Sequence, residues 1–276
     1  MKKTFLLSCL MLAAMPVMAA YTGHVYVDKN KNGVFDQSEK PLAGIKVSDG
    51  LNVVETAADG SFTLPGHERE RFIFITTPSG YKTFNRHYHK IEKKQSGYDF
   101  DLIPYSGRIR KDGSHRYIHI TDTEIFNTEN HADWVNNVHD YARNEQAAFI
   151  IHTGDICYEK GLKAHIKLMN TENMDCPVFY CIGNHDLVKG KYGEELFESI
   201  YGPVYYSFDA GNVHYVVTPM PGGDHAPGYT SDDVCRWLKN DLTHIRPGTP
   251  VVVFNHDLLT YEDTFIFKSK NAGSIN

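Results

Sequence analysis

The chain has 276 residues and a formal net charge of −6, and 41% of its residues are hydrophobic, 12% aromatic and 22% charged. This composition excludes a disordered protein, because the chain has enough apolar surface to bury a core. The length suits one large domain or two modest ones. No Lys/Arg-rich run is present, which argues against a nucleic-acid-binding protein. After the first twenty residues, no stretch is apolar enough to span a membrane.

The first twenty residues have the pattern of a signal peptide, which we place at residues 1–20. A basic start at Met1–Lys3 precedes a mostly apolar stretch over residues 4–18, and Ala19 or Ala20 offers the cleavage site. A membrane anchor is the alternative, but the apolar stretch is short and has no stop-transfer flank. We therefore expect an exported protein, periplasmic or secreted, without a membrane anchor after cleavage.

Export makes disulfide bonds possible for the cysteines of the mature chain. Cys176 and Cys181 are close enough in sequence to pair, but no spacing matches a zinc ribbon or Cys-x-x-Cys. We favour partly buried thiols over a disulfide or a redox function. The four cysteines are Cys157, Cys176, Cys181 and Cys235.

Residues 21–105 have the pattern of an all-β domain. Apolar and polar residues alternate in short runs, as they do around Val25 and Val27. Turn sequences such as that at residues 58–60 separate the runs, and no helical period is present. Short strands at this spacing predict a β-sandwich. Residues 106–114 contain two glycines and several basic residues and are the expected linker.

From residue 115 onward, apolar strands alternate with amphipathic helices, which is typical of an α/β domain. We assign residues 115–276 to this second domain. Its strands are expected at residues 117–120, 149–151, 178–180 and 251–254, with a hairpin over residues 205–217. A helix is expected around residues 132–142, and Thr230 and Asp233 form a capping box that begins another.

Four polar clusters directly follow four of these strands. They are Asp122-Thr123-Glu124, Gly154-Asp155, Gly183-Asn184-His185-Asp186 and Asn255-His256. Because buried strands of an α/β sheet deliver loops to one edge, we expect these side chains to meet there. Carboxylates, an amide oxygen and an imidazole suit divalent metals, and two metals about 3.5–4 Å apart can clamp a phosphate and activate a bridging water. A single cluster of this kind is usually only a turn.

With all four motifs in this order, the chain resembles the calcineurin-like metallophosphoesterases. That family has Asp-x-His, Gly-Asp, Gly-Asn-His-Asp/Glu, a single His and then Gly-His-x-His. The segments at residues 201–208 and 211–214 also resemble the family, so the resemblance runs from residue 115 to the C-terminus. It implies an α/β (α+β) metallophosphoesterase sandwich, here incomplete at its C-terminus. The all-β domain before it is expected to be an Ig-like or prealbumin-like sandwich, as in exported bacterial members.

The resemblance also implies a role for each matched residue. Four side chains would hold two divalent metal ions, of manganese, iron, zinc or magnesium, namely Asp122, Asp155, Asn184 and His256. Asp155 would bridge the two ions. His185 would face the phosphate, where it stabilises the transition state or protonates the leaving oxygen. Asp186 either orients His185 or caps the helix that follows, and both roles stay open.

Two departures from the family pattern bear on activity. Glu124 stands where the family usually has a metal-binding His; it either ligates, which favours manganese or magnesium over zinc, or lies on the surface. The chain also ends at Asn276, before any Gly-His-x-His, a motif that normally gives one His to each metal. We therefore expect a truncated domain with weakened metal binding and poor activity.

A second metal site is expected in the β domain, where a twelve-residue segment fits the pattern of a calcium-binding loop. Its flanks are predicted strands, so it is not an EF-hand; it resembles loops in calcium-binding β-sandwich repeats of bacterial surface proteins. A turn rich in Asp and Asn that needs no ion is the alternative. The expected ligands are Asp28, Asn30, Asn32, the Val34 carbonyl, Asp36 and Glu39.

The sequence thus predicts an exported metallophosphoesterase that hydrolyses phosphomonoesters or phosphodiesters, without deciding between them. The alternative is an inert exported protein, in which the truncated domain has no activity and the β domain binds calcium, a glycan or a protein. We expect a phosphoester as partner and no nucleic acid. Asp224 and His225 lie in a Pro/Gly-rich loop that can approach the substrate, although such sequences more often form plain surface loops.

Overall fold

A computed structural model describes residues 20–105, 108–126, 129–188 and 190–257. Most of the predicted signal peptide, residues 1–19, therefore lies outside the described residues. Among the helices of the described parts, none is long and apolar enough to cross a membrane.

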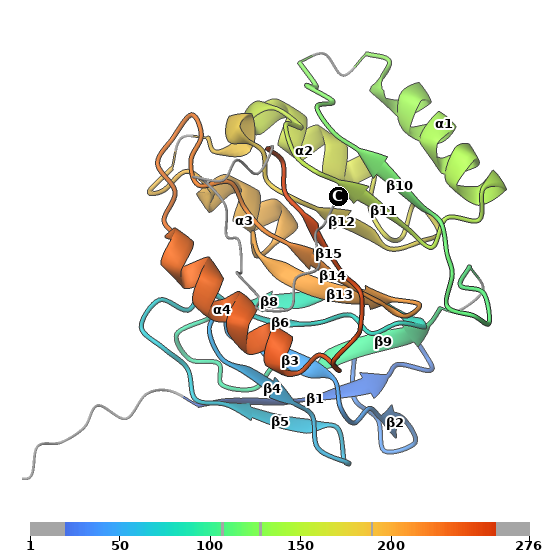
Figure 1. Ribbon diagram of the computed structural model, residues 1–276, viewed down its shortest axis with the longest axis vertical. Coiled ribbons are helices and arrows are strands. Elements are labelled where there is room, and N and C mark those ends of the chain that lie inside the picture. Colours follow the sequence, from blue (N-terminus) through green and yellow to red (C-terminus); the bar gives the residue numbers. More distant parts are fainter. Residues whose placement is uncertain (1–19, 106–107, 127–128, 189, 258–276) are drawn as a thin grey trace, which may run out of the picture.

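The first region, up to residue 105, contains nine strands and no helix in its described residues (Figure 1). One sheet has the order β2-β1-β9-β7, with β5 also paired to β1, and the other has the order β4-β3-β6-β8. Both sheets contribute to one core, in which Val25, Val47 and Ile73 are fully buried. The Ig-like or prealbumin-like type stays a prediction. The strands are β1 (Tyr21–Val27), β2 (Lys40–Pro41), β3 (Lys46–Ser48), β4 (Val53–Glu55), β5 (Ser61–Leu64), β6 (Phe72–Ile75), β7 (Tyr81–Thr83), β8 (Tyr88–Lys90) and β9 (Phe100–Pro104).

The second region is a mixed α/β unit with two three-stranded sheets. Strands β10, β11 and β12 pair in parallel, whereas β13 and β14 form an antiparallel hairpin and β15 runs parallel to β14. The mixed α/β architecture is as predicted. Its elements are β10 (Tyr117–Ile120), α1 (His131–Asn144), β11 (Phe149–His152), α2 (Tyr158–Leu168), β12 (Val178–Tyr180), the 3₁₀ turn η1 (Asn184–Asp186), α3 (Glu195–Tyr201), β13 (Tyr206–Ala210), β14 (Val213–Val217), α4 (Ser231–Thr243) and β15 (Val251–Phe254).

Helix α4 begins at the predicted capping box. The Thr230 hydroxyl accepts a hydrogen bond from the Asp233 N–H at 3.2 Å, and the Asp233 carboxylate accepts one from the Thr230 N–H at 2.9 Å. These bonds satisfy N–H and carboxylate groups that a free helix end leaves to water. The helix buries Val234, Trp237 and Leu238. Helix α2 was not expected from the sequence, and for α3 only a helix somewhere after Asp186 was expected.

The two regions share a hydrophobic core. Phe74 of β6 contacts Trp237 of α4, with ring centroids 6.2 Å apart. Residue Thr77, just after β6, forms a β-bridge with Phe208 of β13. Phe72, Phe74 and Phe208 belong to the same buried cluster, so aromatic side chains from both regions pack against each other. In Figure 1, α4 and β13 lie against the sheet that contains β3, β6 and β8.

A buried histidine lies next to this shared core. His214 of β14 is 1% exposed and lies between two carboxylates, with Asp209 Oδ1 2.6 Å from Nδ1 and Asp241 Oδ2 2.7 Å from Nε2. Burial acts to lower the pKa of His214, but the two carboxylates outweigh it and raise that pKa to about 9. His214 is therefore a buried cation at neutral pH, held by Asp209 and Asp241.

The contacts of both carboxylates reach residues of the β domain. Asp241 accepts a hydrogen bond from the Ser207 hydroxyl at 2.9 Å, and Ser207 lies 2.9 Å from the Thr76 hydroxyl. Asp209 forms an ion pair with Lys46 of β3 at 3.1 Å. A continuous polar chain therefore crosses the contact between the two regions at two places.

The four cysteines of the described residues are all free thiols. Cys157, Cys176 and Cys181 are buried, and Cys235 is partly buried. Burial raises the pKa of the Cys176 thiol to about 11, so this group is protonated and unreactive at neutral pH. The prediction of partly buried thiols, rather than a Cys176–Cys181 disulfide, is confirmed.

Candidate metal centre

Three of the predicted metal ligands meet at the carboxyl ends of three strands. Asp122 follows β10, Asp155 follows β11 and His256 follows β15. One ligand atom of each lies within 4.8 Å of the other two, and His256 Nε2 is 3.4 Å from an Asp155 carboxylate oxygen. Two carboxylates and an imidazole form a donor set that suits divalent first-row metals.

The ring of His256 is oriented for ligation. Its Nδ1 lies 2.8 Å from the Thr153 carbonyl oxygen, which can only accept, so Nδ1 carries the proton. Nε2 therefore faces the oxygens of Asp155 and Asn184, and it lies 3.2 Å from Asn184 Oδ1. Metal-binding histidines are usually held in this way through their second nitrogen. The residues present thus fit a divalent metal.

Electrostatics ties His256 to Asp155. Burial acts to lower the pKa of His256, but its hydrogen bond and ion pair with Asp155 raise it overall. Burial likewise acts to raise the pKa of Asp155, and His256 with the His185 N–H outweighs it and lowers that pKa. Asp155 is therefore ionised at neutral pH, and a proton on His256 competes with a metal ion for the same nitrogen.

Two glycines allow the ligand loops to touch. A Cβ on Gly183 would lie 2.2 Å from the Asp155 nitrogen, and one on Gly154 would lie 2.4 Å from the Gly183 nitrogen. No side chain fits at either position, and Gly154 also has φ +105°. The close approach lets the His185 N–H donate to Asp155 Oδ1 at 3.0 Å. The glycines of both motifs thus bring the loops after β11 and β12 into contact.

The backbone at this edge of the sheet is strained. Asp122, Glu124 and Asp155 all have positive φ values, of 51°, 40° and 53°. Residues other than glycine adopt this conformation at a cost of about 1–3 kcal/mol each, and such residues gather at functional sites. The strain is offset by backbone hydrogen bonds between loops, from Asp122 N–H to the Gly154 oxygen and from Glu124 N–H to the Asp155 oxygen, both at 3.0 Å.

The structure does not bring Glu124 into the ligand cluster. Its side chain is exposed, and within the described residues the cluster consists of Asp122, Asp155 and His256. Glu124 instead lines a cavity of about 490 Å³ together with Asp122 and Trp134. Its role as a ligand stays a prediction.

His185 lies beside the cluster and is held by a residue that the sequence did not single out for this role. Its Nδ1 is 2.9 Å from an Asp224 carboxylate oxygen, and this hydrogen bond raises the pKa of His185 above its usual value. The loop that carries Asp224 is fixed on the same turn, because the Asp224 N–H donates to the Asn184 oxygen at 3.1 Å. Gly223 permits this contact, since a Cβ there would lie 2.6 Å from the Asn184 oxygen.

Two roles were left open for Asp186, orienting His185 or capping the helix that follows, and its contacts in this structure fit neither. The Asp186 carboxylate is fully buried and accepts hydrogen bonds from the N–H groups of Gly183, at 3.0 Å, and Cys157, at 2.9 Å. Burial raises the pKa of Asp186 to about 6. Asp186 therefore caps its own 3₁₀ turn and fixes the start of α2, while Asp224 orients the imidazole.

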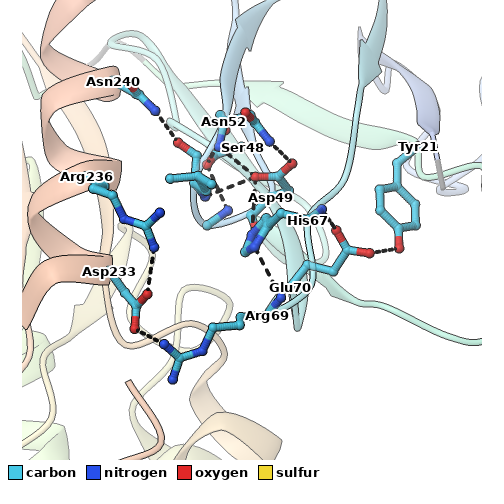
Figure 2. Close-up of polar contacts among 12 residues, drawn as sticks. Tyr21, Ser48, Asp49, Asn52, His67, Arg69, Glu70, Asp233, Arg236 and Asn240 are labelled. Carbon is cyan, nitrogen blue, oxygen red and sulfur yellow. Dashed lines mark hydrogen bonds and ion pairs between the residues drawn. The ribbon is translucent and has the colours of Figure 1, made fainter. Parts of the chain in front are cut away.

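A second group of ligand-type side chains lies in the β domain, in the part of that domain that faces α4 (Figure 2). Asp49, His67 and Glu70 each place one ligand atom within 4.8 Å of the others. Each of the three already has protein partners. The Asp49 carboxylate accepts hydrogen bonds from backbone N–H groups of its own turn, and the Glu70 carboxylate accepts from the Tyr21 hydroxyl and the His67 N–H. His67 Nε2 lies 3.0 Å from the backbone carbonyl oxygen of Asp49. We interpret this group as structural.

Beside it, polar contacts attach α4 to the β domain. Asp233 of α4 pairs with Arg69 of the β domain at 2.9 Å and with Arg236 of its own helix at 3.0 Å (Figure 2). The Asn240 side chain donates to the Leu51 oxygen at 2.7 Å. Arg69 is about half exposed, so its ion pair contributes modestly, and the contacts mainly set the position of the helix.

The predicted calcium loop after β1 is closed by its own hydrogen bonds. The buried Asp28 carboxylate accepts from the N–H groups of Lys31, at 2.6 Å, and Gly33, at 2.9 Å. Asp36 accepts from the Asn30 amide at 2.8 Å, and Glu39 from the Lys29 N–H at 2.8 Å. Among the described residues, the carboxylates of this loop do not form a cluster within 4.8 Å, unlike the two groups above.

Comparisons with known proteins agree with this geometry. Residues 115–270 match the model of a family described as calcineurin-like phosphoesterase, and residues 29–104 match that of the N terminal of calcineurin-like phosphoesterase. No curated protein matches the chain. The match at residues 115–270 covers more than half of the chain, and the family consists of hydrolases that cleave phosphoester bonds with divalent metal ions. The chain therefore belongs to the calcineurin-like phosphoesterase family.

Proposed function

We propose that this protein is an exported phosphoesterase that hydrolyses phosphomonoesters or phosphodiesters with two divalent metal ions. The observation that carries the proposal is the convergence of Asp122, Asp155 and His256 at one edge of the sheets, with His185 beside them. Export rests on the signal-peptide pattern of residues 1–20. The domain limits at residues 21–105 and 115–276 and the Ig-like or prealbumin-like type of the first domain belong to the same proposal.

The site residues have two roles in this proposal, since some would hold the metal ions and others would position the substrate. Asp122, Asp155, Asn184 and His256 would hold the metal ions, which when bound supply Lewis acidity and activate water for attack on phosphorus. His185 stands at the edge of this group, about one-third exposed, so it can reach the phosphate or the leaving oxygen. The Asp224 carboxylate accepts a hydrogen bond from His185 Nδ1, which fixes the ring and leaves Nε2 for the substrate.

Metal dependence gives the direct test. With p-nitrophenyl phosphate and bis(p-nitrophenyl) phosphate, we expect release of p-nitrophenol by the mature protein in the presence of Mn²⁺. Chelation with EDTA should abolish it, and added Mn²⁺ should restore it, because no protein side chain at the site replaces the metal. The preferred ester assigns the substrate class. Hydrolysis that resists EDTA, or none with Mn²⁺, Zn²⁺, Mg²⁺ or Fe²⁺, would refute the proposal.

The loop from Asp28 to Glu39 is the second place where we propose a metal, here calcium. Its oxygens come from Asp28, Asn30, Asn32, Asp36 and Glu39, a set that suits a hard cation. For a dissociation constant on the order of 10⁻³ M, 10 mM CaCl₂ should stabilise the protein by about 1.4 kcal/mol. We expect a Tm higher by a few degrees with Ca²⁺ than with Mg²⁺, and the rise should vanish in Glu39→Gln. Equal shifts for both ions would show that the loop is only a turn.

A further inference from the structure

Two exposed aromatic side chains stand beside His185. Phe126, which follows the first ligand loop, is 58% exposed, and Tyr158, at the start of α2, is 42% exposed. Their ring centroids are 5.7 Å apart with a tilt of 46°. The Tyr158 ring is also 5.7 Å from the imidazole of His185. We call Phe126 and Tyr158 together the aromatic platform, and this platform is in contact with His185, the proposed catalytic residue.

The backbone that positions Tyr158 is strained. Tyr158 has φ +48° and Cys157 has φ +76°, conformations that side chains other than glycine rarely adopt. The strained turn is fixed by a hydrogen bond that the Cys157 N–H donates to the buried Asp186 carboxylate at 2.9 Å. Tyr158 is therefore directed to the surface by a built turn and does not merely lie on a helix that happens to be exposed.

Exposed apolar residues scattered singly need no explanation, whereas contiguous exposed apolar surface marks binding sites. Here two exposed rings are in contact with each other, and the Tyr158 ring is also in contact with His185. The platform has the size of one ring system. Burial raises the pKa of the Tyr158 phenol, and the negative charges of Asp224, Asp155 and Glu124 raise it further, so the platform lies near carboxylates. An extended acyl chain needs a longer apolar groove than two tilted rings offer. A flat ring needs only the ring faces, because aromatic groups stack in offset or tilted pairs.

We propose that Phe126 and Tyr158 hold a planar aromatic ring of the substrate, an aryl group or a nucleobase, on the leaving-group side of the scissile phosphoester. The inference rests on the proposed function, since it places the ring next to the phosphate that His185 faces. It narrows the substrate to phosphoesters whose leaving group carries such a ring. Stacking of one base on an aromatic side chain corresponds to about a 10-fold change in binding.

The test compares selectivity in variants that keep apolar character but lose the rings. We would measure kcat/KM for p-nitrophenyl phosphate and for glycerol 2-phosphate with wild type, Phe126→Leu, Tyr158→Leu and the double variant. The aryl-to-alkyl ratio should fall about 10-fold in the double variant, because intrinsic leaving-group reactivity cancels between proteins. Tyr141→Leu is the matched control, since Tyr141 is 60% exposed near the end of α1 and should leave the ratio unchanged.

A binding measurement separates this inference from the proposed function. Adenosine carries a flat ring and no phosphate, and its weak binding can be followed by saturation-transfer NMR without any turnover. Binding to wild type, absent from the double variant and kept in Tyr141→Leu, supports the platform even in a protein that does not hydrolyse esters. Hydrolysis with an unchanged aryl-to-alkyl ratio would overturn the platform and leave the phosphoesterase intact. Equal adenosine signals for wild type and the double variant would overturn it as well.

Discussion

Asp155→Asn should lower kcat for the preferred p-nitrophenyl ester by about 10³-fold. The side chain stands at the centre of the ligand cluster, 3.4 Å from His256 Nε2. The substitution removes the negative charge that attracts a divalent metal, and a neutral amide oxygen is a weaker donor than a carboxylate, so we expect a loss of several kcal/mol in stabilisation of the reaction. The Asn oxygen can still accept the hydrogen bond from the His185 N–H, so we expect the fold to survive.

The control for this variant is Asp232→Asn. Asp232 is 80% exposed and pairs with Arg236 on the surface of α4, so the same change of charge there should leave kcat unaltered. Circular dichroism and Tm of both variants should match wild type within a few degrees. If Asp155→Asn kept more than a tenth of the wild-type kcat while remaining folded, Asp155 would not be a metal ligand.

Stability should fall as the pH rises from about 6.5 to 9, through the titration of His214. The folded state raises the pKa of His214 to about 9, against about 6.5 in an unfolded chain. The extra stability is therefore fully present below pH 6.5 and is lost as pH rises through the folded pKa. The free energy of unfolding should decrease by about 3 kcal/mol over this range, which urea titrations at several pH values can measure.

A variant isolates this contribution from other groups that titrate at high pH. His214→Gln leaves the buried carboxylate of Asp241 without its cation, which should cost about 3 kcal/mol at pH 6 and less at pH 9.5. The difference between wild type and variant should therefore shrink with rising pH. His244→Gln serves as the control, because His244 contacts Glu55 near the surface. Parallel pH profiles for wild type and His214→Gln would contradict the buried ion network.

Local sequence signals predicted much of the fold. Strands before the motifs, the hairpin of β13 and β14 and the start of α4 at Thr230 all depend on nearby residues, through apolar runs, a turn and a capping box. Helix α2 was missed, and the bounds of α3 could not be given because it has only seven residues. Its position depends on burial of Phe197 and Glu198, which only the tertiary structure provides.

The candidate site was predictable where a motif lies next to a strand. Asp122, Asp155 and His256 follow β10, β11 and β15, so the edge of the sheets brings them together. The partner of His185 was not predictable in this way. Asp186 is adjacent in sequence but points into the core, whereas Asp224 comes from a loop 39 residues away. The Pro/Gly-rich character of that loop was the only signal of its approach.

The shared core makes the stability of the two regions interdependent. The two matched regions meet between residues 104 and 115, where sequence comparison alone would divide the chain into two domains. Yet Phe74 packs on Trp237, Lys46 pairs with Asp209 across the contact, and the buried cluster continues through both. Cutting the chain between them would expose aromatic surface on each half. The boundary seen in sequence comparison is thus not a boundary of independent stability, and we expect each half to lose stability when it is expressed without the other.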